Sequence, residues 1–210
     1  MARYTDSVCR LCRRQQEKLF LKGTRCNTDK CAVNKRNFPP GQHGSAKTRM
    51  KLSNYGLQMR EKQKVKRIYG VLESQFRGYF AQASKSKGVT GKVLLQLLER
   101  RLDNVIFRMG LGLSRSHARQ IVRHNHVSVN NRRVNIPSYL IRTGDVVAIT
   151  GKETGKNRIK ENLEYTKERS VPAWLEFAPA QLTARVVRLP EKSDILHPIE
   201  EQLIVELYSK

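Results

Sequence analysis

The stretch RLDNVIFRMGLGLSRSHARQIVRHNHVSVNNRRVNIPSYLIRTGDVVAI, residues 101–149, contains a succession of patterns that predicts a small α+β module. Apolar residues spaced by three and four predict a helix from residue 92 to Gly110. The same spacing predicts a second helix after Ser114 or Ser116, either of which can act as its N-cap. The residues around Asn130-Asn131 alternate like a β-hairpin, and GDVVAI, residues 144–149, has the apolar run of a buried strand. The predicted order is helix, helix, hairpin and strand.

The basic residues of this module are all arginine. No lysine occurs from residue 93 to 151, and the nine basic residues from 99 to 150 are arginines. The planar guanidinium matches phosphate oxygens and base edges with two parallel hydrogen bonds, which suits fixed recognition of RNA better than diffuse attraction. In the second predicted helix Arg115, Arg119 and Arg123 follow at intervals of four. We therefore expect them on one outward face, opposite the apolar side of the helix.

The net charge of the whole chain is +23, and it is distributed unevenly. Residues 1–98 carry 22 basic against 5 acidic residues, residues 99–150 carry 9 against 3, and residues 151–210 carry 10 of each. This excess predicts a polyanionic partner for the first 150 residues. The cations occur in several segments instead of lining one helix face, which favours nucleic acid over a membrane surface. The sequence shows no secretory signal and no run of about 18 apolar residues, so we expect a cytoplasmic protein without a membrane partner.

All four cysteines lie in CRLCRRQQEKLFLKGTRCNTDKC, residues 9–31. Cys9, Cys12, Cys26 and Cys31 form two pairs whose spacing is close to that of tetrahedral metal sites. Disulfides would need an oxidising compartment, which nothing in the sequence supports. We therefore expect a metal cofactor, zinc, with an iron–sulfur cluster as the alternative that the spacing leaves open. The metal would fold a segment that is poor in large apolar residues, and the surrounding cations would offset the thiolate charge.

Two further segments carry side chains suited to RNA. The turn-rich link RNFPPGQHGSAKTRM, residues 36–50, has glycines that allow a close approach of the backbone to phosphates or bases. Its expected RNA contacts are Gln42, His43, Lys47 and Arg49. Residues 55–83 predict one helix with a buried aliphatic and aromatic stripe and a separate basic face. The expected phosphate contacts of this helix are Arg60, Lys62, Lys64, Lys66 and Arg67.

Residues 101–149 closely resemble the small RNA-binding module named after ribosomal protein S-four. The similarity extends to the four-cysteine window, PPGQHG, YGLQMREKQKVKRIYGVLESQFRGYF and the closing LIVELYSK, which all resemble the bacterial ribosomal family in its four-cysteine form. The resemblance implies a structural protein of the small ribosomal subunit that is a primary binder of small-subunit ribosomal RNA and nucleates assembly of the subunit body. It also implies contacts with the neighbouring ribosomal protein S-five and with the messenger RNA path into the subunit, and a contribution to translational accuracy. Residues 151–169 and DILHPIEEQ depart from the usual pattern of the family.

The expected fold is α+β, with an N-terminal four-cysteine metal knuckle, a helical domain, and a helix-helix-hairpin RNA-binding module of the ribosomal S-four type. The expected domains are 1–45 for metal binding, 46–98 with 190–210 for the helical domain, and 99–189 for RNA binding with a core module at 99–150. The neutral last 60 residues are expected either to offer a protein-facing surface or simply to cap the core. The expected RNA contacts of the module are Arg101, Arg108, Ser114, Arg115, Ser116, His117, Arg119, Gln120, Arg123, Asn131, Arg132 and Arg133.

Catalysis is not expected. The same RNA module is appended to RNA-modifying enzymes such as pseudouridine synthases, which place a catalytic aspartate in a separate large domain. Here Asp103 lies inside a leucine-striped helix, where we expect it to pair with a nearby arginine at the helix surface. The roughly 60 residues after the module are too few for a catalytic domain, and no small-molecule substrate site is recognisable. An additional role as a messenger-binding regulator stays open, because it would use the same surface.

Overall fold

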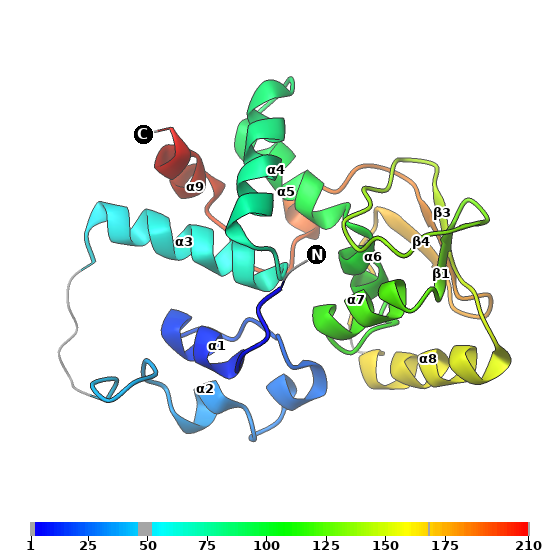
Figure 1. Cartoon of the computed structure of the whole chain (residues 1–210), viewed down its shortest axis with the longest axis horizontal. Coiled ribbons are helices and arrows are strands. Elements are labelled where there is room, and N and C mark those ends of the chain that lie inside the picture. The colour runs from blue at the N-terminus through cyan, green and yellow to red at the C-terminus, as the bar shows by residue number, and fades with distance from the viewer. Residues whose placement is uncertain (1–2, 46–51, 168, 210) are drawn as a thin grey trace. The chain divides into compact units, whose positions relative to one another are not determined.

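The computed structural model describes residues 3–45, 52–167 and 169–209 (Figure 1). The chain divides into two compact units. The first unit comprises Met1–Val93 and His197–Lys210, and the second unit comprises Leu94–Leu196. Among the described helices, none is long and apolar enough to cross a bilayer.

The N-terminal part of the first unit consists of short elements. They are α1 (Cys9–Gln15), the 3-10 helix η1 (Gly23–Asn27) and α2 (Ala32–Lys35). Helix α1 ends at Gln16, whose backbone is left-handed with φ 59°. Arg13 on this helix donates to the carbonyls of Phe38 and Pro39 and lies 4.8 Å from the centre of the Phe38 ring. These contacts join α1 to the beginning of the link at residues 36–45.

The prediction of one helix for residues 55–83 is wrong, because two helices occupy this range. They are α3 (Asn54–Ile68) and α4 (Glu73–Lys85). Gly70 between them has φ +63°, and the amides of Gly70 and Val71 donate back to Arg67 and Lys66. Glycine adopts this left-handed conformation without a steric penalty and so ends α3 in a Schellman-type turn. The aromatic stripe was predicted correctly as core, since Phe76 and Tyr79 are buried.

The C-terminal helix α9 (Glu201–Tyr208) returns to the first unit and packs against α3. The Tyr208 ring stacks on Phe80 with centroids 4.6 Å apart, and its hydroxyl donates to Glu73 at 2.7 Å. Glu73 also accepts from Lys62 at 3.0 Å and from Lys66 at 2.9 Å. A residue near the end of the chain thus joins a charged cluster built from α3 and α4.

The helix predicted from residue 92 to Gly110 is also interrupted. It consists of α5 (Thr90–Glu99), which begins in the first unit, and α6 (Leu102–Arg108). Between them Arg101 has an extended backbone and forms an isolated bridge with Leu140. The Leu102 amide donates to the carbonyl of Tyr139 and the Ile141 amide to that of Arg100. Pairing with residues 139–141 therefore replaces the helical hydrogen bonds at this point.

Helix α7 (Arg115–Arg123) follows α6, and the predicted cap is confirmed, because Ser114 Oγ accepts the His117 amide at 3.3 Å. The predicted hairpin is confirmed as β1 (Val127–Val129) and β2 (Arg132–Arg133), joined by Asn130 and Asn131 at φ 50° and 64°. The Asn130 side chain also bonds the next strand, donating to Asp145 at 2.8 Å and accepting from the Val146 amide at 2.9 Å. The turn is therefore attached to β3 as well as to its own strands.

The sheet of the second unit is antiparallel, in the order β2-β1-β3-β5-β4. The predicted strand within residues 144–149 is β3 (Val146–Ile149), and Val127 pairs with Ile149 across β1 and β3. The remaining elements of the unit are α8 (Glu153–Thr166), β4 (Leu175–Ala178), β5 (Thr183–Val186) and the 3-10 helix η2 (Lys192–Asp194).

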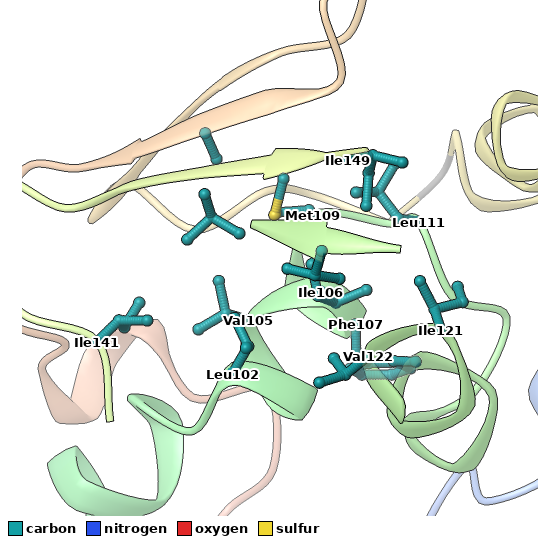
Figure 2. Packing of buried hydrophobic residues seen from close by; sticks show 14 of the residues in the cluster. Leu102, Val105, Ile106, Phe107, Met109, Leu111, Ile121, Val122, Ile141 and Ile149 are labelled. Carbon is teal, nitrogen blue, oxygen red and sulfur yellow. The ribbon is translucent and has the colours of Figure 1, made fainter. Parts of the chain in front are cut away.

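One hydrophobic core joins α6 and α7 to the sheet. Figure 2 shows Val105 and Ile106 of α6 and Ile121 of α7 directed toward the strands, opposite Ile149 of β3. Trp174, which precedes β4, is fully buried in the same core. Residues of the neutral C-terminal part therefore complete the core of the second unit, which agrees with the expectation that this part caps the core.

Candidate nucleic-acid interface

Two buried carboxylates organise the arginines of the second unit. Glu99 at the end of α5 is fully buried. Arg108 donates to both of its oxygens, with Nη2–Oε1 at 2.7 Å and Nε–Oε2 at 2.9 Å. Asn104 Nδ2 donates to the same carboxylate at 2.8 Å. Bidentate charge-assisted bonds of this kind fix a guanidinium in one orientation.

Asp103 forms the second of these clusters and is 5% exposed, not a surface residue as predicted. It accepts from Arg101 Nη2 at 2.7 Å and Nε at 3.1 Å, and from Arg119 Nη1 of α7 at 3.1 Å. Burial lowers the pKa of the Arg119 guanidinium, while the charge of Asp103 opposes this shift. The predicted partnership of Asp103 with an arginine is confirmed, but it links α6 to α7 inside the unit.

Arg115 is also directed inward. Its Nε donates to Asn104 Oδ1 at 2.9 Å, and its guanidinium carbon lies 4.4 Å from the centre of the Phe107 ring. The expectation that Arg115 and Arg119 point outward is therefore wrong, because α7 turns them toward the carboxamide and carboxylate of α6. The predicted RNA contacts Arg101 and Arg108 are 0% and 1% exposed, so they cannot present their guanidinium groups to an RNA surface in this conformation.

A different face of α7 is open to solvent. Ser116, Gln120 and Arg123 are exposed, and they are spaced by four and three residues, which places them on one side of the helix. Asn131, Arg132 and Arg133 of the hairpin are exposed as well. Ser114 is buried as the helix cap, and burial lowers the pKa of half-buried His117. The predicted contacts that remain available in the second unit are thus those on the exposed side of α7 and on the hairpin.

The predicted contacts on α3 mostly bind groups of the first unit. Besides the Glu73 pairs of Lys62 and Lys66, Lys64 Nζ lies 3.2 Å from Glu17 and 2.6 Å from the Pro198 carbonyl. Arg60 Nη2 donates to the Arg14 carbonyl at 2.9 Å. Burial lowers the pKa of Arg67, and the charge of Arg14 lowers it further. The basic face predicted for this helix therefore contributes to the packing of the unit.

The link at residues 36–50 is described only to Ser45. Gln42 and His43 are exposed, as their predicted role requires. The predicted contacts Lys47 and Arg49 lie outside the described residues.

The four thiols lie around one small cavity. Cys9, Cys12, Cys26 and Cys31 all line it, and all four are free thiols. The Lys22 amide donates to Cys26 Sγ at 3.3 Å. Burial raises the pKa of Cys12 to about 11, although a hydrogen bond from the Leu19 backbone lowers it, and burial also raises the pKa of Cys26. Within residues 3–45, 52–167 and 169–209, no three His, Cys, Asp or Glu side chains are arranged to hold a metal ion as they stand.

Five buried or half-buried residues that bind the arginines or the backbone of the second unit were not predicted from the sequence, namely Glu99, Asn104, Asn162, Thr166 and Arg169. A signal was present for Glu99, because a carboxylate in a leucine-rich stripe needs a buried cation. No comparable signal marked the last three. They belong to α8 and the residues after it, in the segment that departs from the usual family pattern.

Comparison with known proteins assigns the chain to a family. The model for the ribosomal protein S4/S9 N-terminal domain matches residues 3–99, and the model for the S4 domain matches residues 100–147. The small ribosomal subunit protein uS4 of Pelotomaculum thermopropionicum is 60% identical over 210 residues, which cover all of both chains. The uS4 protein of Thermodesulfovibrio yellowstonii and the uS4A protein of Symbiobacterium thermophilum are each 58% identical over the same full length. The chain therefore belongs to the bacterial family of small ribosomal subunit protein uS4, whose members are structural components of the ribosome and not enzymes.

Proposed function

We propose that the chain is a primary binder of small-subunit ribosomal RNA and that it nucleates assembly of the subunit body. The observation that carries this proposal is the division of the arginines in the second unit. Four of them are held inside by Glu99, Asp103 and Asn104, while Arg123, Arg132 and Arg133 are exposed. The internal arginines fix the geometry of α6 and α7, and the exposed ones are free to meet phosphates and base edges on a preformed surface.

The RNA would contact Ser116, Gln120 and Arg123 on α7 together with Asn131, Arg132 and Arg133 on the hairpin. An exposed arginine that forms a bidentate bond to the RNA should contribute about 1–3 kcal/mol and about one unit to the slope of log affinity against log salt. Exposed cations of the first unit add attraction that does not depend on sequence. Gln42 and His43 in the link are candidates for a second contact.

The experiment is a filter-binding salt titration on small-subunit ribosomal RNA with Arg123→Ala, Arg132→Ala and Arg133→Ala. Each should weaken binding and lower the slope, and Arg→Lys at the same positions should recover the slope but only part of the affinity, because lysine lacks the planar fork. Circular dichroism establishes that the variants are folded. Wild-type binding by all three alanine variants would show that the RNA-binding surface lies elsewhere.

We also propose that the four cysteines bind zinc, with an iron–sulfur cluster as the alternative. Their shared cavity and the amide hydrogen bonds to the sulfurs of Cys12 and Cys26 support this, since thiolates around a metal ion commonly accept such bonds from the backbone. Cys9, Cys12, Cys26 and Cys31 would hold the zinc as thiolates, and the metal would supply structural cross-linking only. Elemental analysis of protein purified without chelator should find one metal equivalent, and Cys26→Ser should abolish it.

The proposed protein partner is the neighbouring ribosomal protein S-five. Residues 151–196 of the second unit are close to neutral, with nine basic and seven acidic residues, and outside the core this part exposes Val187, Leu189 and Leu196 at 52%, 41% and 55%. Exposed apolar side chains in a neutral region suit a protein partner better than RNA. We further propose that the chain lines part of the messenger RNA path and contributes to translational accuracy. Reconstituted subunits carrying Val187→Ser and Leu189→Ser should retain less S-five and misread more often if this surface is the contact.

A further inference from the structure

The connection between α6 and α7 is held by side chains from a distant part of the chain. Its residues Gly110–Leu113 each present a backbone carbonyl to a donor within residues 162–169. Thr166 Oγ1 lies 2.8 Å from the Gly110 oxygen, nearer than the Asn162 and Leu163 carbonyls of its own helix at 3.0 and 3.4 Å, and Asn162 Nδ2 donates to Leu111 at 3.0 Å. Arg169 donates to Gly112 at 3.2 Å and to Leu113 at 3.3 Å. Four consecutive carbonyls of one connection are therefore bound by three side chains.

The Arg169 guanidinium is the central group of this arrangement. Besides its two bonds to the connection, it donates to the Phe107 carbonyl at 3.3 Å, and its carbon lies 4.1 Å from the centre of the Phe107 ring. Burial lowers its pKa, and the charge of Arg108 lowers it further. A partly desolvated cation is retained only where its hydrogen bonds are satisfied, so a planar group with several well-placed carbonyls is held in one orientation.

The connection leads directly into the N-terminus of α7 and cannot shift without moving it. A Cβ atom on Gly112 would lie 2.8 Å from Ala118 Cβ and 2.9 Å from the Ala118 backbone nitrogen. A side chain on Gly110, at φ +78°, would lie 2.9 Å from Thr166 Oγ1. The backbone of residues 110–113 is therefore enclosed between α7 on one side and α8 on the other, with the cap residue Ser114 immediately after it.

We infer that Asn162, Thr166 and Arg169 are positioning residues for RNA recognition, because they fix the connection that sets the axial and rotational position of α7. This inference rests on the proposed function, in which Ser116, Gln120 and Arg123 contact the RNA. The residues touch the carbonyls of the connection and act on the RNA only through α7. An error of a fraction of an ångström at this connection is carried to Arg123 at the other end of the helix.

The test uses the full-length chain with Arg169→Lys and Thr166→Val, and with Arg158→Gln as the matched control. Arg169→Lys keeps the charge but cannot reach the three carbonyls with one planar group, and Thr166→Val keeps the shape but removes the hydroxyl. Arg158 is an exposed arginine of α8, the helix that carries Thr166. Affinity for small-subunit ribosomal RNA is measured across a salt series at 25 °C. Fluorescence of Trp174, the single tryptophan, reports the fold of the second unit, and amide hydrogen exchange reports residues 110–117.

Arg169→Lys should bind about tenfold more weakly, the equivalent of one well-placed hydrogen bond, and Thr166→Val about threefold more weakly. The salt slope should stay at the wild-type value, because no phosphate contact is lost, and exchange should accelerate in residues 110–117 alone. Arg158→Gln should leave exchange there unchanged.

Wild-type affinity in folded Arg169→Lys would overturn the inference. A slope lowered by about one unit in Thr166→Val would also overturn it, because that loss of a phosphate contact could not be caused by the change in geometry that we infer. Arg123→Ala, measured in parallel, separates the two proposals. If Arg123→Ala binds like wild type, Arg123 is not an RNA contact, and a tenfold loss in Arg169→Lys would then still support positioning of Ser116 and Gln120. Wild-type affinity in both variants would refute the contact at Arg123 and the positioning role together.

Discussion

The most demanding test of the buried charge clusters is Asp103→Asn. The substitution keeps the size of the side chain but removes the negative charge that holds Arg101, which is 0% exposed, and Arg119, which is 7% exposed. Asparagine can accept at one oxygen only, and its amide hydrogens would face guanidinium donors that now lie 2.7–3.1 Å from the Asp103 oxygens. Breaking a buried ion pair by removing one partner costs about 3–5 kcal/mol. A domain of this size has a free energy of unfolding of about 5–15 kcal/mol, so the loss would be a large fraction of the total.

Urea unfolding followed by Trp174 fluorescence measures this loss, because the single tryptophan is fully buried in the second unit. Glu176→Gln is the matched control. It makes the same chemical change at an exposed position on β4 and should alter the unfolding free energy by less than about 0.5 kcal/mol. A loss below about 1 kcal/mol in Asp103→Asn would refute the reasoning, since it would mean that water or another group compensates both arginines. Wild-type protein incubated with small-subunit ribosomal RNA should leave the nucleosides unmodified, and so should Asp103→Asn, because no catalysis is expected.

Three further predictions concern other parts of the molecule. Burial would raise the pKa of Glu73, but hydrogen bonds from Tyr208, Lys66 and Lys62 lower it from 4.5 to about 2. Because the pKa of Glu73 is depressed in the folded state, the stabilisation by its carboxylate is complete above about pH 4.5 and is lost as the pH falls through 2. The side chain is 44% exposed, so this stabilisation should not exceed about 1 kcal/mol. The measurement is the difference in unfolding free energy between wild type and Glu73→Gln from pH 6 to 2. Gly112→Ala should destabilise the second unit by about 1–3 kcal/mol in thermal unfolding, because its Cβ would meet the backbone of α7, and an unchanged melting temperature would contradict this. Cys12→Ser should lose the metal and the helicity of residues 9–35, while its Trp174 fluorescence should stay that of the wild type. Four freely titrating thiols in folded, metal-free wild-type protein would contradict the zinc proposal.

The sequence was most informative where a pattern has a local cause. Ser114 as a helix cap, the turn at Asn130-Asn131 and the strand that contains Val147 depend on neighbouring residues, and all three were predicted correctly. The family, the cytoplasmic location that it entails and the absence of catalysis are also confirmed by the relatives.

The predictions were wrong where contacts between residues far apart in the chain determine the conformation. Arginines at intervals of four define a helix face, but the spacing does not say whether that face meets solvent or a buried carboxylate. For Arg115 and Arg119 the partners are Asn104 and Asp103 of α6. The extended backbone at Arg101 was equally hidden, because its pairing partner Leu140 lies 39 residues further along the chain. β4 and β5 were not predicted either, although LEFA and TARV alternate in burial once they pair.

The attachment of Asn130 to β3 also affects the entropy of binding. A two-residue strand at the edge of a sheet would ordinarily sample many backbone conformations, and a partner would have to select one of them. Here one side chain bonds both Asp145 and Val146, so the backbone that carries Arg132 and Arg133 is already ordered before any partner arrives. On association only the two arginine side chains then lose rotamer freedom, at about 0.5–1.5 kcal/mol each, and the hairpin backbone adds little to this loss. A small hairpin can thus behave as a rigid recognition element rather than one that folds onto its partner.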